Sequence, residues 1–96
     1  MASNFRIHCQ RDRDLLYIGL LGDFDEASAC DLIDALKEQC HDASVVFIKA
    51  KGVTNLDASG CEAFKKKLHV LKDWCYRLVF MDQIAARLKP EWIQLF

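Results

Sequence analysis

The sequence predicts an α/β fold in which strands and helices alternate around one four-stranded mixed sheet. Short apolar runs with strand character alternate along the chain with segments whose apolar residues recur at helical spacing. Such alternation predicts parallel strands joined by right-handed helical crossovers. Two opening strands, separated only by a short charged turn, add an antiparallel hairpin. We therefore expect the order β-β-α-β-α-β-α in a single domain over residues 1–96, with the helices mainly on one face of the sheet.

The first two strands have different apolar patterns. Residues 5–10 alternate between apolar and polar side chains, which is typical of a half-exposed strand. Residues 15–21 are almost entirely apolar, which predicts an interior strand that ends at Gly22. The four charged residues 11–14 predict the turn of a hairpin.

Two helices are predicted from capping patterns followed by apolar residues at intervals of three or four. Ser28 with Asp31 resembles a capping box, as does Ser59 with Glu62. The apolar stripe of the first helix consists of Ala29, Leu32, Ile33, Leu36 and Cys40. The stripe of the second consists of Cys61, Phe64, Leu68, Leu71 and Cys75.

The remaining elements follow from shorter signals. Residues 45–48 (Val-Val-Phe-Ile) predict a strand buried on both faces, and residues 51–56 are expected to be a connecting segment because they contain Gly52. Residues 76–81 predict a further strand, and residues 83–88 a short helix limited by Pro90.

Composition excludes several classes of function. The chain has 96 residues, of which 52% are hydrophobic, and 13 basic against 14 acidic residues give a net charge of −1. Nucleic-acid binding usually requires a basic excess, which is lacking here. No apolar run approaches the roughly 20 residues of a membrane helix, and no signal peptide is evident. Five cysteines without a Cys-x-x-Cys pair fit a reducing compartment, so we expect a cytoplasmic protein.

Two short motifs carry a family resemblance. Gly22-Asp23-Phe24-Asp25 leads into the first predicted helix, and Asp57-Ala58-Ser59-Gly60 opens the second. Together, in this order and element pattern, they resemble the STAS family, the domain shared by bacterial anti-sigma factor antagonists and sulfate transporters. The resemblance covers roughly residues 5–88 and implies a STAS-like fold. It also implies a non-catalytic protein-binding role in bacterial regulation and signalling.

The resemblance implies a partner and a binding surface. Stand-alone members of the family bind an anti-sigma factor that is also a switch kinase, which phosphorylates the first serine of an Asp-Ser-Ser-Gly element. Here the matching residue is Ala58, which has no hydroxyl, and Ser59 matches the second serine. The domain therefore binds constitutively, uses Ser59 as acceptor, or serves another system. The implied partner-binding residues are Asp23, Asp25, Asp57, Ala58, Ser59 and Gly60.

A second implied role is that of an accessory subunit attached to the ATPase of a lipid transporter of the ABC type, since the family includes stand-alone domains of similar length with this role. The sequence offers no motif for a catalytic nucleophile, a metal or a phosphate-binding loop, so we expect neither an enzyme nor a cofactor. The pair Cys40-His41 lacks the four-ligand spacing of a zinc site.

Several of these residues have a structural interpretation beside the functional one. Ser59 is an ordinary helix cap or a phosphoacceptor, and Asp25 and Asp57 are caps or partner contacts. Cys61 opens an apolar stripe, so a buried core position is favoured over a reactive thiol. The three lysines 65–67 form a solvated helix face or a contact for an acidic partner. The apolar residues 92–96 fold onto the core or mark an interface.

Overall fold

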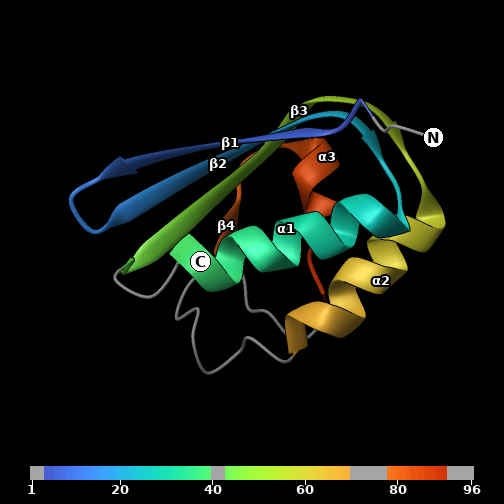
Figure 1. The fold of residues 1–96 in the computed structure, drawn as a ribbon. Coiled ribbons are helices and arrows are strands. Elements are labelled where there is room, and N and C mark those ends of the chain that lie inside the picture. Colours follow the sequence, from blue (N-terminus) through green and yellow to red (C-terminus); the bar gives the residue numbers. More distant parts are fainter. Residues whose placement is uncertain (1–3, 40–42, 70–77, 91–96) are drawn as a thin grey trace.

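The computed structural model, which describes residues 4–39, 43–69 and 78–90, contains one four-stranded sheet in the order β1-β2-β3-β4. Helices α1 and α2 pack together beneath it (Figure 1). The elements along the chain are β1 (Arg6–Asp12), β2 (Leu15–Phe24), α1 (Glu26–Gln39), β3 (Val45–Leu56), α2 (Ala58–Leu68), β4 (Leu78–Phe80) and α3 (Gln83–Ala86). This confirms the predicted order and the mixed sheet.

Strands β1 and β2 form the predicted antiparallel hairpin. All seven residues of β1 pair with β2, and the last pair is Asp12 opposite Leu15. The turn between them consists of Arg13 and Asp14, and Arg13 has a φ of 58°. A positive φ at the first turn position is typical of tight two-residue hairpins, whose twist matches that of the strands they join.

Strand β3 is longer than the sequence predicted. Residues 51–56 were expected to be a connecting segment, but the strand continues to Leu56 and stays parallel to β2. Most side chains in this second half are exposed or half-buried, so the apolar alternation that marks a strand is weak there. A Cβ atom at Gly52 would lie 3.0 Å from the carbonyl oxygen of Leu20. The Leu21 side chain would lie closer still, so the glycine that suggested a turn makes room for this side chain and for the neighbouring backbone of β2.

Strand β4 is short, and α3 follows it beside β3. The Asp82 carboxylate accepts hydrogen bonds from the backbone N–H of Ala50 in β3, at 2.9 Å, and of Ala85 in α3, at 2.7 Å. The Asp82 side chain thus accepts a hydrogen bond from a backbone N–H at the edge of β3 and also caps α3. Strand β4 occupies three positions of the predicted strand over residues 76–81, of which residues 76–77 lie outside the described part. The predicted helix over residues 83–88 is the shorter α3.

The core lies on the face of the sheet that α1 and α2 cover (Figure 1). Alternate side chains of the two central strands are buried on this face: Leu16, Ile18, Leu20, Val46, Ile48 and Ala50. The predicted stripes of the two helices supply the opposite wall with Ala29, Leu32, Ile33, Leu36, Cys61, Phe64 and Leu68. These positions confirm the helical periods. The stripe positions Cys40, Leu71 and Cys75, like His41 and residues 92–96, lie outside the described residues.

Both long helices begin earlier than predicted because aspartates cap them. Helix α1 starts directly after Asp25, whose Oδ1 accepts a hydrogen bond from the Ser28 N–H at 2.9 Å. Helix α2 starts directly after Asp57, whose Oδ1 accepts from the Ser59 N–H at 3.3 Å. A carboxylate both binds a free N–H group and complements the positive end of the helix. The capping boxes predicted at Ser28 and Ser59 were therefore wrong.

Candidate functional site

The carboxyl ends of the parallel strands β2 and β3 lie side by side and form the floor of an open hollow. The two ends are joined by a hydrogen bond of 2.9 Å from the Asp57 N–H to the Phe24 carbonyl oxygen. The hollow has a volume of about 430 Å³. Its lining residues are Asp23, Phe24, Asp25, Asn55, Leu56, Asp57 and Ala58. Three of the aspartates named in the sequence analysis therefore meet in one place.

Asp25 is held by a serine buried beneath it. The Ser28 hydroxyl oxygen, in a side chain only 1% exposed, lies 2.9 Å from Asp25 Oδ1 and 3.0 Å from the Asp23 carbonyl oxygen. Hydrogen bonds from the Ser28 N–H and then from its hydroxyl lower the pKa of the Asp25 carboxyl group. This carboxylate therefore remains negative to a lower pH than an ordinary aspartate.

Asp57 is fixed by its role at the start of α2. Its two carboxylate oxygens accept from the N–H and the hydroxyl of Ser59, the hydroxyl at 2.9 Å. Its carbonyl oxygen accepts the Cys61 N–H at 3.1 Å, which closes the first helical turn. The cap interpretation of Asp57 is confirmed, and the residue also lines the hollow. The Ser59 hydroxyl is exposed but engaged by this neighbouring negative charge.

Asp23 is exposed and anchored from both sides. Its N–H donates to Asn4 Oδ1 at 2.9 Å, and its Oδ1 accepts from the Thr54 hydroxyl of β3 at 3.1 Å. Because each of the three aspartates accepts at least one hydrogen bond from a neighbouring backbone or hydroxyl group, the site presents negative charge from a defined scaffold.

Ala58 and Gly60 have different positions in this site. Ala58 is exposed and lines the hollow. Gly60 is buried, and a Cβ atom there would lie 2.8 Å from the carbonyl carbon and oxygen of Asp25. Gly60 therefore contributes close packing between the two helix starts and offers no group to a ligand.

Asn55, Leu56 and Thr54 contribute to the site although no motif in the sequence marks them. They belong to the half of β3 that was expected to be a connecting segment. Ser28 was expected to cap a helix, whereas its hydroxyl donates a hydrogen bond to the Asp25 carboxylate. The sequence feature that could have identified these four residues is that they stand just before or after the two motifs.

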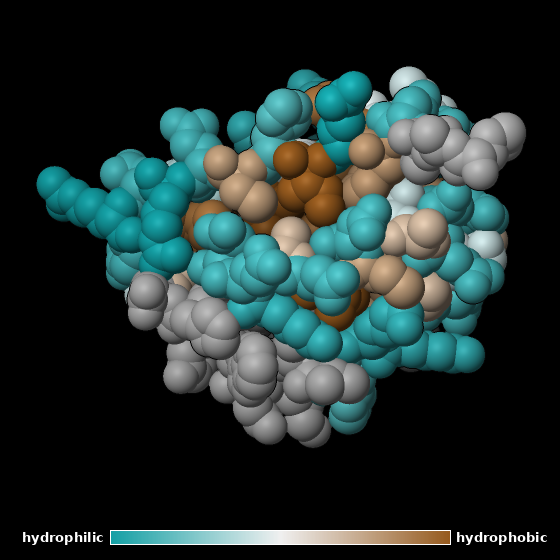
Figure 2. Space-filling model, in the orientation of Figure 1, coloured by the Kyte–Doolittle hydropathy of each residue, from teal (hydrophilic) through white to brown (hydrophobic). Residues whose placement is uncertain are grey.

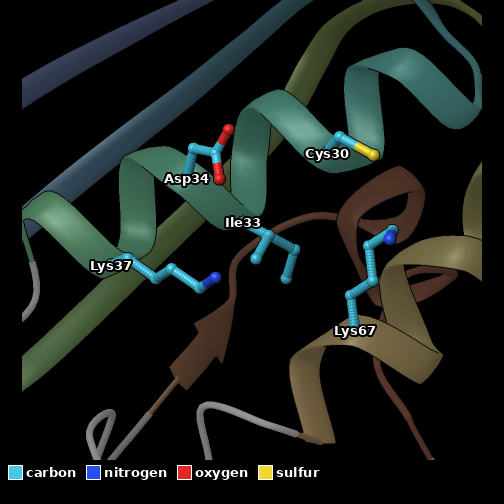
Figure 3. A pocket seen from close by; sticks show the side chains of 5 residues that line it. All are labelled: Cys30, Ile33, Asp34, Lys37 and Lys67. Carbon is cyan, nitrogen blue, oxygen red and sulfur yellow. The ribbon is translucent and has the colours of Figure 1, made fainter.

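A second hollow, of about 230 Å³, lies between α1 and α2 (Figure 3). Lys37 and Asp34 project from α1, and Lys67 projects from α2. Its other lining residues are Cys30 and Ile33. Lys67 is exposed, which fits both the solvated face and the contact for an acidic partner, and the hollow carries charges of both signs.

Cys61 occupies the core position that was favoured for it, with 8% of its surface exposed. Burial raises the pKa of its thiol, which opposes formation of the nucleophilic thiolate. Within residues 4–39, 43–69 and 78–90, no group of three or more histidine, cysteine, aspartate or glutamate side chains has an arrangement that could hold a metal ion, and this includes the three aspartates of the hollow. No helix in those ranges is both long and apolar enough to cross a bilayer.

Comparisons with known proteins show similarity in structure only. No family model and no curated protein sequence matches the chain. The crystal structure of Mglu superposes with a TM-score of 0.68 at 21% identity, over 91% of this chain and 20% of the Mglu chain. The chain thus spans between a fifth and about a quarter of the Mglu chains that it matches, with 22% of a second one and 26% of a third covered.

Two further similar structures match over most of their own length. An uncharacterized DUF3478-family protein with a SpoIIAA-like fold, from Shewanella loihica, has a TM-score of 0.59 at 17% identity, over 86% of this chain and 72% of that one. The unphosphorylated anti-sigma factor antagonist SpoIIAA has a TM-score of 0.50 at 15% identity, over 96% and 88% of the two chains. The fold of this chain is therefore STAS-like, as its two motifs predicted.

Proposed function

We propose that this domain functions by binding a partner protein through the acidic hollow at the ends of β2 and β3, without catalysing a reaction. The observation that carries the proposal is the convergence of three anchored aspartates on one open surface, in a chain whose net charge is only −1. Charges held on a rigid scaffold favour an oppositely charged surface and speed its association. The partner should therefore present lysine or arginine side chains. The proposed binding residues are Asp23, Asp25, Asp57, Ala58 and Ser59, while the buried Gly60 keeps the two helix starts in close contact.

The partner class that we propose is an anti-sigma factor of the switch-kinase type, in the cytoplasm of a bacterium. The support is the structural similarity to the anti-sigma factor antagonist SpoIIAA, together with the motif that opens α2. Because Ala58 has no hydroxyl, we propose that binding here is constitutive. The similarity to a fifth of Mglu indicates that the same fold also occurs within larger chains.

Removing the charge of two aspartates should weaken partner capture without disturbing the fold. In a D23N/D57N variant, asparagine retains an oxygen that accepts the hydrogen bonds from Thr54 and from the Ser59 N–H. We expect affinity for the captured partner to fall roughly fivefold to thirtyfold, mainly through slower association. The measurement is a pull-down from lysate of the producing cell with identification by mass spectrometry, followed by surface plasmon resonance with the purified partner.

The matched control is D31N/D34N, which removes the same charge from exposed positions of α1 outside the hollow. Its affinity should remain within about twofold of wild type. Equal weakening in both double variants would contradict the proposed surface. Capture of a transporter ATPase, with the same sensitivity to the D23N/D57N change, would replace the anti-sigma partner with the accessory-subunit role.

Restoring a hydroxyl at the first position of α2 should restore a switch. We expect A58S to accept phosphate from the captured kinase and ATP, while the wild-type protein remains unmodified. Phosphate would add a charge of about −1.5 to −2 beside three carboxylates, so affinity should fall at least about tenfold. Intact-mass spectrometry measures the modification and surface plasmon resonance the binding. Modification of wild-type Ser59 would contradict constitutive binding.

A further inference from the structure

The outer edge of β1 is a seven-residue strand edge with a pattern that is complementary to itself. Strand β1 is the first strand of the sheet and pairs only with β2 among the described elements (Figure 1). Its side chains are exposed except for the half-buried Ile7. Such an edge presents unpaired backbone groups to which another strand can add.

The hairpin turn determines which backbone groups point outward. In a hairpin closed by a two-residue turn, the flanking pair, here Asp12 and Leu15, exchanges both hydrogen bonds, and the pairs alternate from there. The N–H and C=O groups of every second residue therefore face β2. Those of Ile7, Cys9 and Arg11 face away from the sheet. Within the described ranges, no backbone hydrogen bond between elements engages these outward groups.

We propose that two copies of this chain associate through antiparallel pairing of β1 with β1, centred on Cys9. Cys9 is the middle residue of Arg6–Asp12 and has outward-facing backbone groups, so a two-fold axis beside it places Cys9 opposite its copy. The register then brings Ile7 opposite Arg11. These three cross-strand pairs form six backbone hydrogen bonds.

Charge complementarity identifies a second copy as the occupant. In this register Arg6 of each copy lies directly opposite Asp12 of the other, so the symmetry creates two ion pairs. His8 lies opposite Gln10, so this pair does not place like charges opposite each other. A shift of the register by two residues in one direction places Arg6 opposite Gln10, and a shift in the other direction places Asp12 opposite His8 and Arg6 opposite Asp14 of the turn. Only the centred register therefore pairs Arg6 with Asp12 inside the strand.

The surface next to this edge is apolar. On the face shown in Figure 2, brown atoms gather in the area between β1 and α1. Ile7 on this side packs partly against the core. The Arg11 guanidinium donates to the Gln39 carbonyl oxygen at the end of α1, at 3.0 Å, so its stem runs across the same side. The β1 strand of the second copy would cover part of this apolar surface. It would place the Ile7 side chain of one copy against the aliphatic part of the Arg11 side chain of the other.

A charge-reversal series tests the register. Wild-type protein should form dimers as its concentration rises from about 10 to about 300 μM, measured by sedimentation velocity. In R6E and in D12R, residues 6 and 12 carry the same charge, and they face each other at two symmetric positions of the dimer. Each variant should therefore raise the dimer dissociation constant at least about tenfold. The R6E/D12R double variant restores opposite charges and should return to within about threefold of wild type. R13E, which reverses a charge in the turn, is the matched control and should change the constant less than about twofold.

Oxidation gives a second, independent readout. Cα atoms of a hydrogen-bonded antiparallel pair lie about 5.5 Å apart, within the range that a disulfide spans. Diamide, which takes up the two electrons and two protons of the paired thiols, should therefore cross-link wild type and C30S but not C9S. A protein that stays monomeric to about 300 μM would overturn the proposal, as would a dimer that the R6E/D12R variant fails to restore. Neither result depends on the partner-binding role of the acidic hollow.

Discussion

Replacing Phe64 by alanine is expected to lower the free energy of unfolding by about 3–5 kcal/mol. Phe64 of α2 has no exposed surface, and its ring lies edge-to-face with Phe24, with centroids 6.4 Å apart. Phe24 in turn lies edge-to-face with Phe5, at 5.5 Å. The substitution removes the ring that joins α2 to the end of β2, and it leaves a cavity that fixed neighbours cannot fill. Single domains of this size have total stabilities of about 5–15 kcal/mol, so the loss is a large share.

Urea unfolding followed by far-UV circular dichroism measures this change. F64L keeps most of the buried volume and should cost less than about 1.5 kcal/mol. K66A, at an exposed position of the same helix, should stay within about 0.5 kcal/mol of wild type. A loss below about 1 kcal/mol in F64A would contradict the packing of α2 described above.

The second large effect is expected at Gly60. In an ordinary helix, replacing glycine by alanine stabilises the protein by up to about 1 kcal/mol. Here the added Cβ would lie 2.8 Å from the Asp25 carbonyl group and 2.9 Å from its Cα atom. Backbone atoms cannot move aside as a side chain can, so G60A should reverse the usual sign and destabilise by about 1–3 kcal/mol.

The same unfolding experiment distinguishes this effect from a general sensitivity of the helix. S59A, at the exposed neighbouring position, loses one surface hydrogen bond to Asp57 and should change stability by less than about 1 kcal/mol. G60A should also separate Asp25 from Asp57, so partner affinity should fall with stability. Stabilisation by G60A would show that the two helix starts are not in close contact.

Most of the architecture could be predicted because burial on one face leaves a periodic trace. The stripe of Cys61, Phe64 and Leu68 identifies α2, and the apolar run over residues 15–21 identifies a central strand. The second half of β3 was not predicted because few of its side chains are buried there, and polar residues such as Asn55 give no alternation.

The acidic site could be predicted in part. The two motifs marked Asp23, Asp25 and Asp57 as binding residues, and these three residues line one hollow. It did not show which residue caps each helix, because serine and aspartate are both good caps and stood within three positions of each other. The contact of Ser28 with Asp25 and the closeness of Gly60 to the Asp25 backbone arise only when the two helix starts pack together.

The hydrogen bond from the Ala50 N–H to the Asp82 carboxylate affects where further strands can pair with the sheet. On the β4 side, the described residues that pair with β3 are those of Leu78–Phe80, and beyond them the Asp82 carboxylate already accepts the Ala50 N–H. A strand added to β3 beyond Phe80 would therefore find that N–H group already bonded, whereas β1 offers a seven-residue edge. Association through β1 uses the same edge in both copies and so leaves none for a third. The assembly is closed, and concentrated protein should remain in clear solution as pairs instead of growing into fibres.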